Sequence, residues 1–173
     1  MRALNLSSKS DPEKNKMTNH KKTLYLATFA ILFASAQFAL AQEGKKIYAQ
    51  KLLDETLSKH KDVVIMAMHV TPPGKTDNVI IASNIGRIGK KADEDDMRVI
   101  ETGKPNLEVN KKGDHFEVEL VMQDQSGKTI GAVGIVFNYE KGKEAEFQKN
   151  AEQIRDEMKQ KTPTLAKLFE SAN

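Results

Sequence analysis

Between Glu43 and His60 apolar side chains recur every three or four residues, which is the spacing of one face of an amphipathic helix. The positions that form this face are Tyr48, Ala49, Leu52, Leu53 and Leu57. Two apolar runs follow, at 62–70 and 78–83, and Thr71-Pro72-Pro73-Gly74 separates them. Apolar runs broken by Pro and Gly predict two strands joined by an extended loop.

A second helix is predicted after Asp93, a residue type that caps helix N-termini well. Glu94, Asp95 and Asp96 come next in the chain, and negative charge in a first turn is favourable beside the helix dipole. Gly103 and Pro105 end this helix. The acidic run lacks the alternating oxygen ligands of a calcium loop, so it needs no metal ion to explain it.

Beyond this helix the apolar period changes to two, which is typical of strands. In the segment 115–122 the alternation places Phe116, Val118, Leu120 and Met122 on one face. Glu117 and Glu119 occupy the other face, which we interpret as solvated rather than as a catalytic carboxylate pair. Strands are also predicted at 107–109 and 129–139, where Gly131 and Gly134 indicate a bulge or the close packing of another element.

A helix is predicted after Gly142, with Phe147, Ala151, Ile154 and Met158 along one stripe. Thr162 and Pro163 suit the N-cap and first position of a short terminal helix. Together these elements predict an α+β domain, a five-stranded antiparallel sheet with helices packed on it.

The segment 18–41 has the three parts of a secretory signal peptide. Lys21 and Lys22 precede an apolar run, and Ala39-Leu40-Ala41 ends it. We expect cleavage after Ala41, which places the protein in the periplasm or outside the cell and leaves 42–173 as a single domain. The alternative is an uncleaved membrane anchor, because about 20 apolar residues span a bilayer.

The net charge of +3 belongs largely to this leader. Residues 1–41 hold six basic and two acidic residues, so their removal leaves 21 basic and 22 acidic residues. A protein that binds a polyanion needs an excess of basic groups to release counterions, and we therefore expect no nucleic acid partner. The chain contains no cysteine, which excludes disulfides, thiolate metal sites and a cysteine nucleophile.

Two segments resemble Cache domains, the PAS-like extracellular sensors of bacteria: NVIIASNIGRIGKKADEDDMRVIETGKP (78–105) and GKTIGAVGIVFNY (127–139). The resemblance covers about 43–140 and implies a sheet order of 2-1-5-4-3. It also implies a small-molecule pocket between the sheet and the segment 84–105. Cache domains usually precede an intracellular output module, and none follows here, so the resemblance implies a stand-alone exported domain.

The candidate ligand-binding residues lie around the exit of the second strand. Ser83, Asn84, Arg87 and Lys90 combine a hydroxyl, an amide and two cations, and a guanidinium takes carboxylates bidentately. This set favours an organic acid or an amino acid as ligand, and the alternative is that the charges are solvated loop residues. His69 is a further candidate donor, or else a core histidine, since no spacing in the sequence supports a metal site.

Three functions remain open. The first is binding of a small ligand, for sensing or for presentation to a membrane-bound signalling partner. The second is an interaction module without ligand that forms a homodimer through helix 43–60. The third is an undetected hydrolase that uses Ser83 and His69, for which no acid partner or Gly-x-Ser-x-Gly motif is present. We expect no enzymatic activity, cofactor or metal.

Overall fold

A computed structural model describes residues 46–172 of the chain. The chain separates at Gly44 into two units, and the described residues all belong to the second, Lys45–Asn173. The predicted signal peptide at 18–41 lies outside the described residues. Within 46–172, no helix combines the length and the apolar character needed to cross a membrane.

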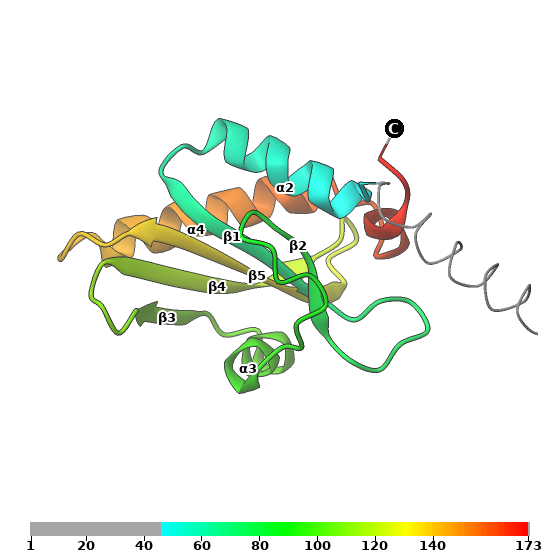
Figure 1. The fold of residues 1–173 in the computed structure, drawn as a ribbon, viewed down its shortest axis with the longest axis horizontal. Coiled ribbons are helices and arrows are strands. Elements are labelled where there is room, and N and C mark those ends of the chain that lie inside the picture. The colour runs from blue at the N-terminus through cyan, green and yellow to red at the C-terminus, as the bar shows by residue number, and fades with distance from the viewer. Residues whose placement is uncertain (1–45, 173) are drawn as a thin grey trace, which may run out of the picture. The chain divides into compact units, whose positions relative to one another are not determined.

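The described chain forms one antiparallel sheet of five strands with helices on both faces (Figure 1). The strands are β1 (Val63–Val70), β2 (Val79–Ser83), β3 (Asn106–Val109), β4 (His115–Gln123) and β5 (Thr129–Asn138). The helices are α2 (Tyr48–Lys59), α3 (Glu94–Thr102), α4 (Glu144–Gln160) and the 3-10 turn η2 (Ala166–Phe169). The order across the sheet is β2-β1-β5-β4-β3, which confirms the predicted α+β class and strand order.

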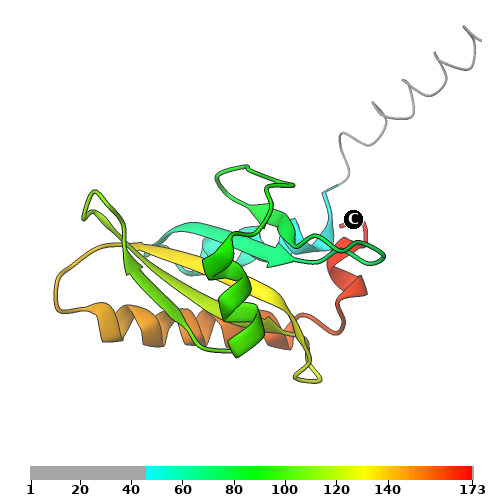
Figure 2. The same cartoon turned by 90° about the horizontal axis from the view of Figure 1, so that it is seen from below.

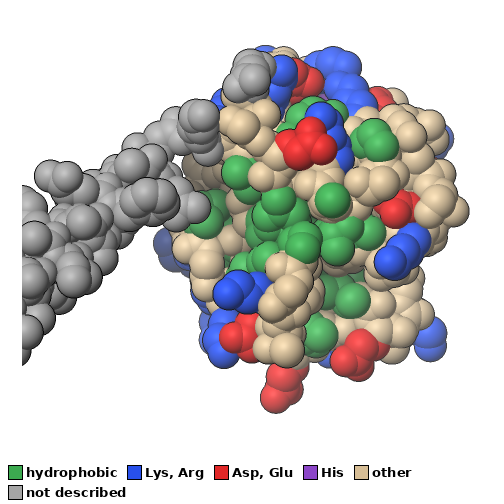
Figure 3. All heavy atoms as spheres, turned by 90° about the vertical axis from the view of Figure 1, so that its right-hand side faces the viewer, with side chains coloured by type: hydrophobic (Ala, Val, Ile, Leu, Met, Phe, Trp, Pro, Cys, Tyr) green, Lys and Arg blue, Asp and Glu red, His purple; other side chains and the backbone are tan. Residues whose placement is uncertain are grey.

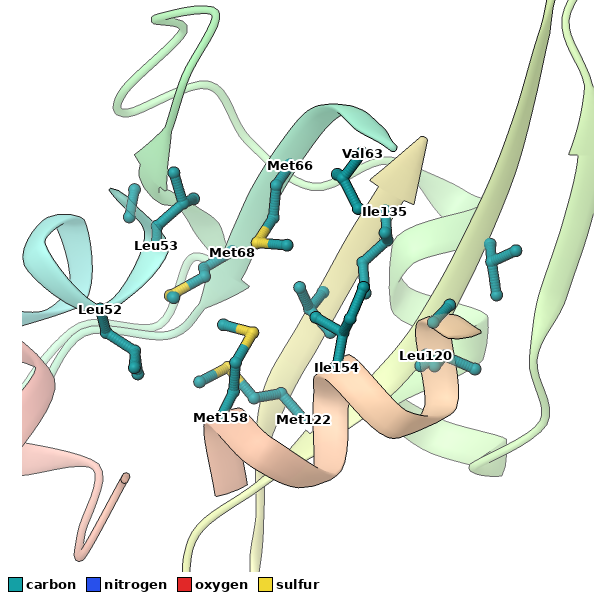
Figure 4. Close-up of a cluster of buried hydrophobic side chains, with 14 of the residues drawn as sticks. Leu52, Leu53, Val63, Met66, Met68, Leu120, Met122, Ile135, Ile154 and Met158 are labelled. Atoms are coloured by element: carbon teal, nitrogen blue, oxygen red, sulfur yellow. The ribbon is translucent and has the colours of Figure 1, made fainter. Parts of the chain in front are cut away.

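The main hydrophobic core lies on the face of the sheet that α2 and α4 cover, which we call the core face. Figure 4 shows side chains from both helices and the sheet meeting there. Ile154 and Met158 of α4 are each 1% exposed, and Met122 of β4 is equally buried. The predicted stripe of the last long helix is therefore confirmed, and burial of its side chains is the main force that holds α4 to the sheet.

The opposite face of the sheet, which we call the second face, is packed by α3 alone among the described helices (Figures 1 and 2). Only Asp96 and Val99 of α3 are buried. Because side chains alternate along strands, this face carries the positions between the core residues. Those positions include Ile65, Ala67, His69, Glu117, Glu119, Gly134 and Val136.

Gly131 marks a close approach of β5 to β1. A Cβ atom at Gly131 would lie 2.1 Å from the His69 carbonyl oxygen, which leaves no room for a side chain. The ladder between β4 and β5 also shifts register between Met122 and Gln123. Both features predicted from the glycines of this strand, close packing and a bulge, are therefore present.

The segment after β2 folds back along the outer edge of that strand. The Gly89 amide donates to the Ile80 carbonyl at 2.8 Å, and the Ile80 amide donates to the Lys90 carbonyl at 2.9 Å. Further along, the Ala92 amide donates to the Asn78 carbonyl at 3.0 Å. The segment 89–92 thus pairs with β2, and the turn before it holds Arg87 at a positive φ of 64°.

Two predictions near the ends of the domain are wrong in detail. The first helix begins at Tyr48 rather than Glu43, and its Leu53 is fully buried in the core. Thr162 does not begin a helix, because its hydroxyl donates to the Met158 carbonyl at 2.9 Å. It satisfies one of the free carbonyls at the end of α4.

The end of the domain where η2 lies is apolar at its centre. Figure 3 shows hydrophobic side chains gathered there, with charged side chains around them. Leu168 of η2 is fully buried, while Leu165 and Phe169 pack against the core at partly buried positions. The last turn of the chain thus closes this end of the core.

Candidate functional site

A contact between His69 and Asp96 on the second face joins β1 to α3. The His69 Nδ1 atom lies 3.1 Å from Asp96 Oδ2, without the alignment of a hydrogen bond, and both side chains are 10% exposed. Asp96 also belongs to the N-terminal cap of α3, because its Oδ2 accepts a hydrogen bond from the Asp93 amide at 2.8 Å. Asp93 in turn accepts from the Asp96 amide, which completes a capping box. The predicted N-cap is therefore confirmed.

Glu119 of β4 extends this network as a buried carboxyl. Its side chain is only 3% exposed and is hydrogen-bonded to Asp96. Burial, followed by the hydrogen bond and the negative charge of Asp96, raises the pKa of Glu119 to about 9. Glu119 is therefore protonated at neutral pH, which allows two carboxyl groups to lie side by side.

Asp96 is the charged member of the pair. Burial acts to raise its pKa, but the interactions with His69, Glu119 and the Asp93 backbone outweigh burial and hold the pKa of Asp96 far below its usual range. One oxygen of Glu119, Oε1, has no hydrogen-bond partner within residues 46–172. The interpretation of Glu117 and Glu119 as a solvated face is thus wrong for Glu119, because α3 covers it.

Beside this network the second face is hollowed. The hollow has a volume of about 280 Å³ and is lined by Ile65, Glu108, Asn110, Lys111, His115, Glu117 and Val136. Four of these residues form one row across four strands, since Glu108 pairs with Glu117, Glu117 with Val136, and Val136 with Ile65. The floor of the hollow is therefore a single register row of β3, β4, β5 and β1.

Glu117 is the acidic group at the centre of that row. Glu117 is exposed to solvent at the surface of the hollow, yet desolvation by the groups around its carboxyl, followed by the charges of Asp96 and Glu108, raises the pKa of Glu117. Gly134 makes room for it, because a Cβ atom there would lie 3.0 Å from Glu117 Oε1. The absence of a side chain at Gly134 lets the carboxylate lie over β5.

The five predicted ligand-binding residues have four different surroundings. Ser83 is buried and its amide donates to Gln50 Oε1 at 3.0 Å. Asn84 bridges to β1, where its Oδ1 accepts from the Met66 amide and its Nδ2 donates to the Val64 carbonyl, both at 2.9 Å. Arg87 and Lys90 are exposed in the turn after β2, and His69 pairs with Asp96.

These surroundings give Ser83 and Asn84 a role in joining β2 to its neighbours, and ligand binding by the five residues stays a prediction. The sequence reasoning missed the network of Asp96 and Glu119. One signal for it was available: an acidic residue on the non-core face of a central strand, in a fold whose crossover helix must pack on that face. Within residues 46–172 no group of three or more His, Cys, Asp or Glu residues is arranged to hold a metal ion.

No family model matches the chain, and no curated protein matches it. Solved structures do. One is the repressor BlcR of Agobacterium tumefaciens, 11% identical, with 76% of this chain and 72% of that chain covered and a TM-score of 0.49. Another is a type II free methionine-R-sulfoxide reductase from Thermoplasma acidophilum, 15% identical, with 72% and 93% covered and a TM-score of 0.46. At these scores the likeness says nothing of activity.

One prediction made from the sequence needs correction. Nucleic acid was excluded as a partner from the charge balance alone. Net charge describes only what the surface of a domain attracts directly. It leaves open a role in a protein whose nucleic acid contacts are made elsewhere, so the exclusion was wrong.

One match with a higher TM-score, which carries weight for the fold, is the nlh2 GAF domain of A. aeolicus, in an inactive state. It is 14% identical, 67% of this chain and 85% of that chain are covered, and the TM-score is 0.52. GAF domains belong to the broad PAS-like class of folds, which agrees with the class expected from the resemblance but does not identify a Cache domain. The described part of the chain has a GAF-like fold.

Proposed function

We propose that the domain binds a small molecule on the second face of its sheet and acts as a sensory module. The observation that carries this proposal is the hollow floored by Glu117, Val136 and Ile65. It lies on the face opposite the main core, beside the network that anchors α3. Concave sites lined by apolar groups and a few polar ones are the usual places where proteins bind small ligands.

The position of the hollow also supplies a route for a signal. Glu117 lies two residues from Glu119 on β4, and Glu119 contacts Asp96 of α3. A ligand that changes the charge at Glu117 changes the electrostatic environment of the α3 anchor. The matched GAF domain is described in an inactive state, which supports two states for a domain of this fold.

Thermal unfolding of the purified protein tests the proposal. The panel contains organic acids (propionate, succinate), amino acids (glycine, glutamate) and amines (butylamine, putrescine). We expect at least one class to raise the unfolding temperature, because a ligand that binds only the native state stabilises it by mass action.

Val136→Phe places a larger ring at a residue that lines the hollow, and we expect it to abolish this rise. The matched control is Leu107→Phe, since Leu107 is 44% exposed and pairs with the core-side position Val118. An undiminished rise in Val136→Phe would contradict the location of the site. No response to any probe would contradict ligand binding.

If the ligand site is instead the predicted acid site around Arg87 and Lys90, the same panel is expected to give a different result. If a carboxylate binds the exposed guanidinium of Arg87, the response to propionate or glutamate disappears in Arg87→Ala and persists in Val136→Phe. The two variants therefore distinguish a site in the turn after β2 from a site in the hollow.

We propose, in addition, that the protein is exported and that residues 1–41 are removed. The support is the order of basic, apolar and small residues in the sequence. Intact-mass measurement of protein recovered from the source cells is expected to give a chain that begins at Gln42. A mass that retains the segment 18–41 would contradict cleavage and favour a membrane anchor.

A further inference from the structure

The hollow brings two carboxylates together with no positive charge between them. Glu108 of β3 and Glu117 of β4 are direct partners in the antiparallel register, and like charges in such positions destabilise a sheet. Within residues 46–172, no ion pair of 4.0 Å or less involves either residue. The two carboxylates therefore outnumber Lys111, the lysine that lines the hollow, and the unliganded hollow has an unbalanced negative charge.

The surroundings of Glu117 add to this imbalance. Asp96 and Asp93 contribute negative charge at Glu117, which His69 offsets only in part. On the rim, His115 already contacts Asp114 at 3.3 Å, which leaves Lys111 as the cation that lines the hollow without an ion pair among the described residues. An anionic ligand would be repelled by Glu108 and Glu117, whereas a cation would be attracted.

A second carboxyl on this face of β4 also lacks a hydrogen-bond donor, although its residue is not part of the lining of the hollow. Glu119 is 3% exposed and its Oε1 has no hydrogen-bond partner in the described chain. It stands on the same face of β4 as Glu117, in the neighbouring row that contains Gly134. A buried acceptor without a donor is costly, and a native structure rarely keeps one without a reason.

The apolar part of the floor limits the rest of the ligand. Ile65 and Val136 form one side of the row, so the ligand needs a short hydrocarbon portion beside its charged end. A volume of about 280 Å³ lies just below the range of small-molecule sites, which run from about 300 to 1,000 Å³. The site is thus suited to a compact ligand.

We propose that the ligand of the hollow is a small organic amine whose ammonium group lies between Glu117 and Glu108, with its hydrocarbon portion on Ile65 and Val136. This inference rests on the proposed function and names the chemical class of its ligand. Three donors on an ammonium group can serve both carboxylates and extend toward β4.

The test compares three probes of the same length and different charge: butylamine, butanol and butyrate. We expect butylamine to raise the unfolding temperature by about 3 °C or more near saturation, with butanol and butyrate giving no comparable rise. Ammonium chloride at equal concentration controls for the ion alone. The butylamine effect is expected to weaken as sodium chloride is added, because salt screens charge pairs that are partly exposed.

Two isosteric variants locate the charge. Glu117→Gln and Glu108→Gln are each expected to remove most of the butylamine effect, and neither is expected to prevent folding, because each relieves a like-charge contact. The matched control Glu146→Gln changes an exposed residue in the first turn of α4 and is expected to keep the full effect.

The inference is overturned if butylamine has no effect, or if its effect is unchanged in both Gln variants. A response to butyrate that Val136→Phe abolishes would overturn the amine class and leave the proposed function intact. If no compound of the wider panel changes the unfolding temperature of the folded protein, both the amine class and the proposed ligand binding are contradicted.

Discussion

Glu119 is a buried carboxyl that lies beside a second acidic side chain, an arrangement in which both groups cannot readily be ionised. A carboxyl that is 3% exposed loses the hydration that stabilises its charge, and Asp96, which interacts with it, is also negative. The structure resolves the conflict by keeping the proton on Glu119 and the charge on Asp96, where His69 and the cap of α3 stabilise it. The unfolded chain has no such conflict, so the two states hold different numbers of protons.

This difference gives stability a predicted pH dependence. In the unfolded chain Glu119 titrates near 4.5, whereas in the native protein it holds its proton up to about pH 9. Between these values the native state binds more protons, so the free energy of unfolding falls as pH rises, by up to about 1.4 kcal/mol per pH unit for one proton. Asp96 acts in the opposite sense, because its stabilising effect is lost only as pH falls below 3.8.

Glu119→Gln is expected to reduce this slope and to raise stability above pH 7, because the amide resembles the protonated carboxyl. Urea unfolding at pH 5, 7 and 9 measures both effects. Glu146→Gln, at an exposed position, serves as the control and should keep the wild-type slope. Equal slopes in wild type and Glu119→Gln would show that Glu119 is ionised in the native state.

At the scale of elements, α3 depends on its first turn more than on apolar contacts. Its buried residues are Asp96 and Val99, and Asp96 alone connects the cap, β1 and β4. The element is held to the second face by these polar interactions together with the burial of Val99. Such an anchor is sensitive to charge, unlike the hydrophobic packing of α4.

Asp96→Ala is therefore expected to lower the free energy of unfolding by about 1–2 kcal/mol, since it removes half of a capping box and the partner of His69. Amide hydrogen exchange should accelerate in α3 more than in α4. Asp95→Ala is the matched control in the same turn, because Asp95 makes only an exposed ion pair with Arg98 and such pairs contribute about 0–1 kcal/mol. Equal costs for the two variants would contradict the anchoring role.

The elements themselves follow from local patterns, which is why the sequence predicts them well. The two-residue alternation around Phe116 and the helical stripe at Phe147 each reflect burial on a single face, and the Asp93 cap is a short-range motif. Thr162 shows where local patterns stop being sufficient. Its hydroxyl can cap a helix that follows it or donate to a carbonyl at the end of the helix before it, and tertiary packing determines which of the two forms. The burial of Glu119 could not be predicted from local sequence, because it depends on where α3 crosses the sheet in the tertiary structure.

At the scale of the whole molecule, the two faces of the sheet have separate tasks. The core face buries the large apolar side chains, such as Phe137, Leu52 and Met158. The second face keeps ionisable residues that a protein optimised for stability alone would avoid. Sequence periodicity identifies the core face of β4 and describes the other face of that strand only as polar, so it could not locate the hollow or the partners of Glu117.

The strand order also determines where another chain can join the sheet. Segment 89–92 occupies the outer edge of β2, so that edge has no free ladder for a neighbour. Within the described chain the open edge is β3, which is only four residues long, and short edges are one way in which proteins limit fibril formation. Strand addition, whether by a peptide or by a second copy in an aggregate, is therefore confined to the side of the domain that carries Glu108.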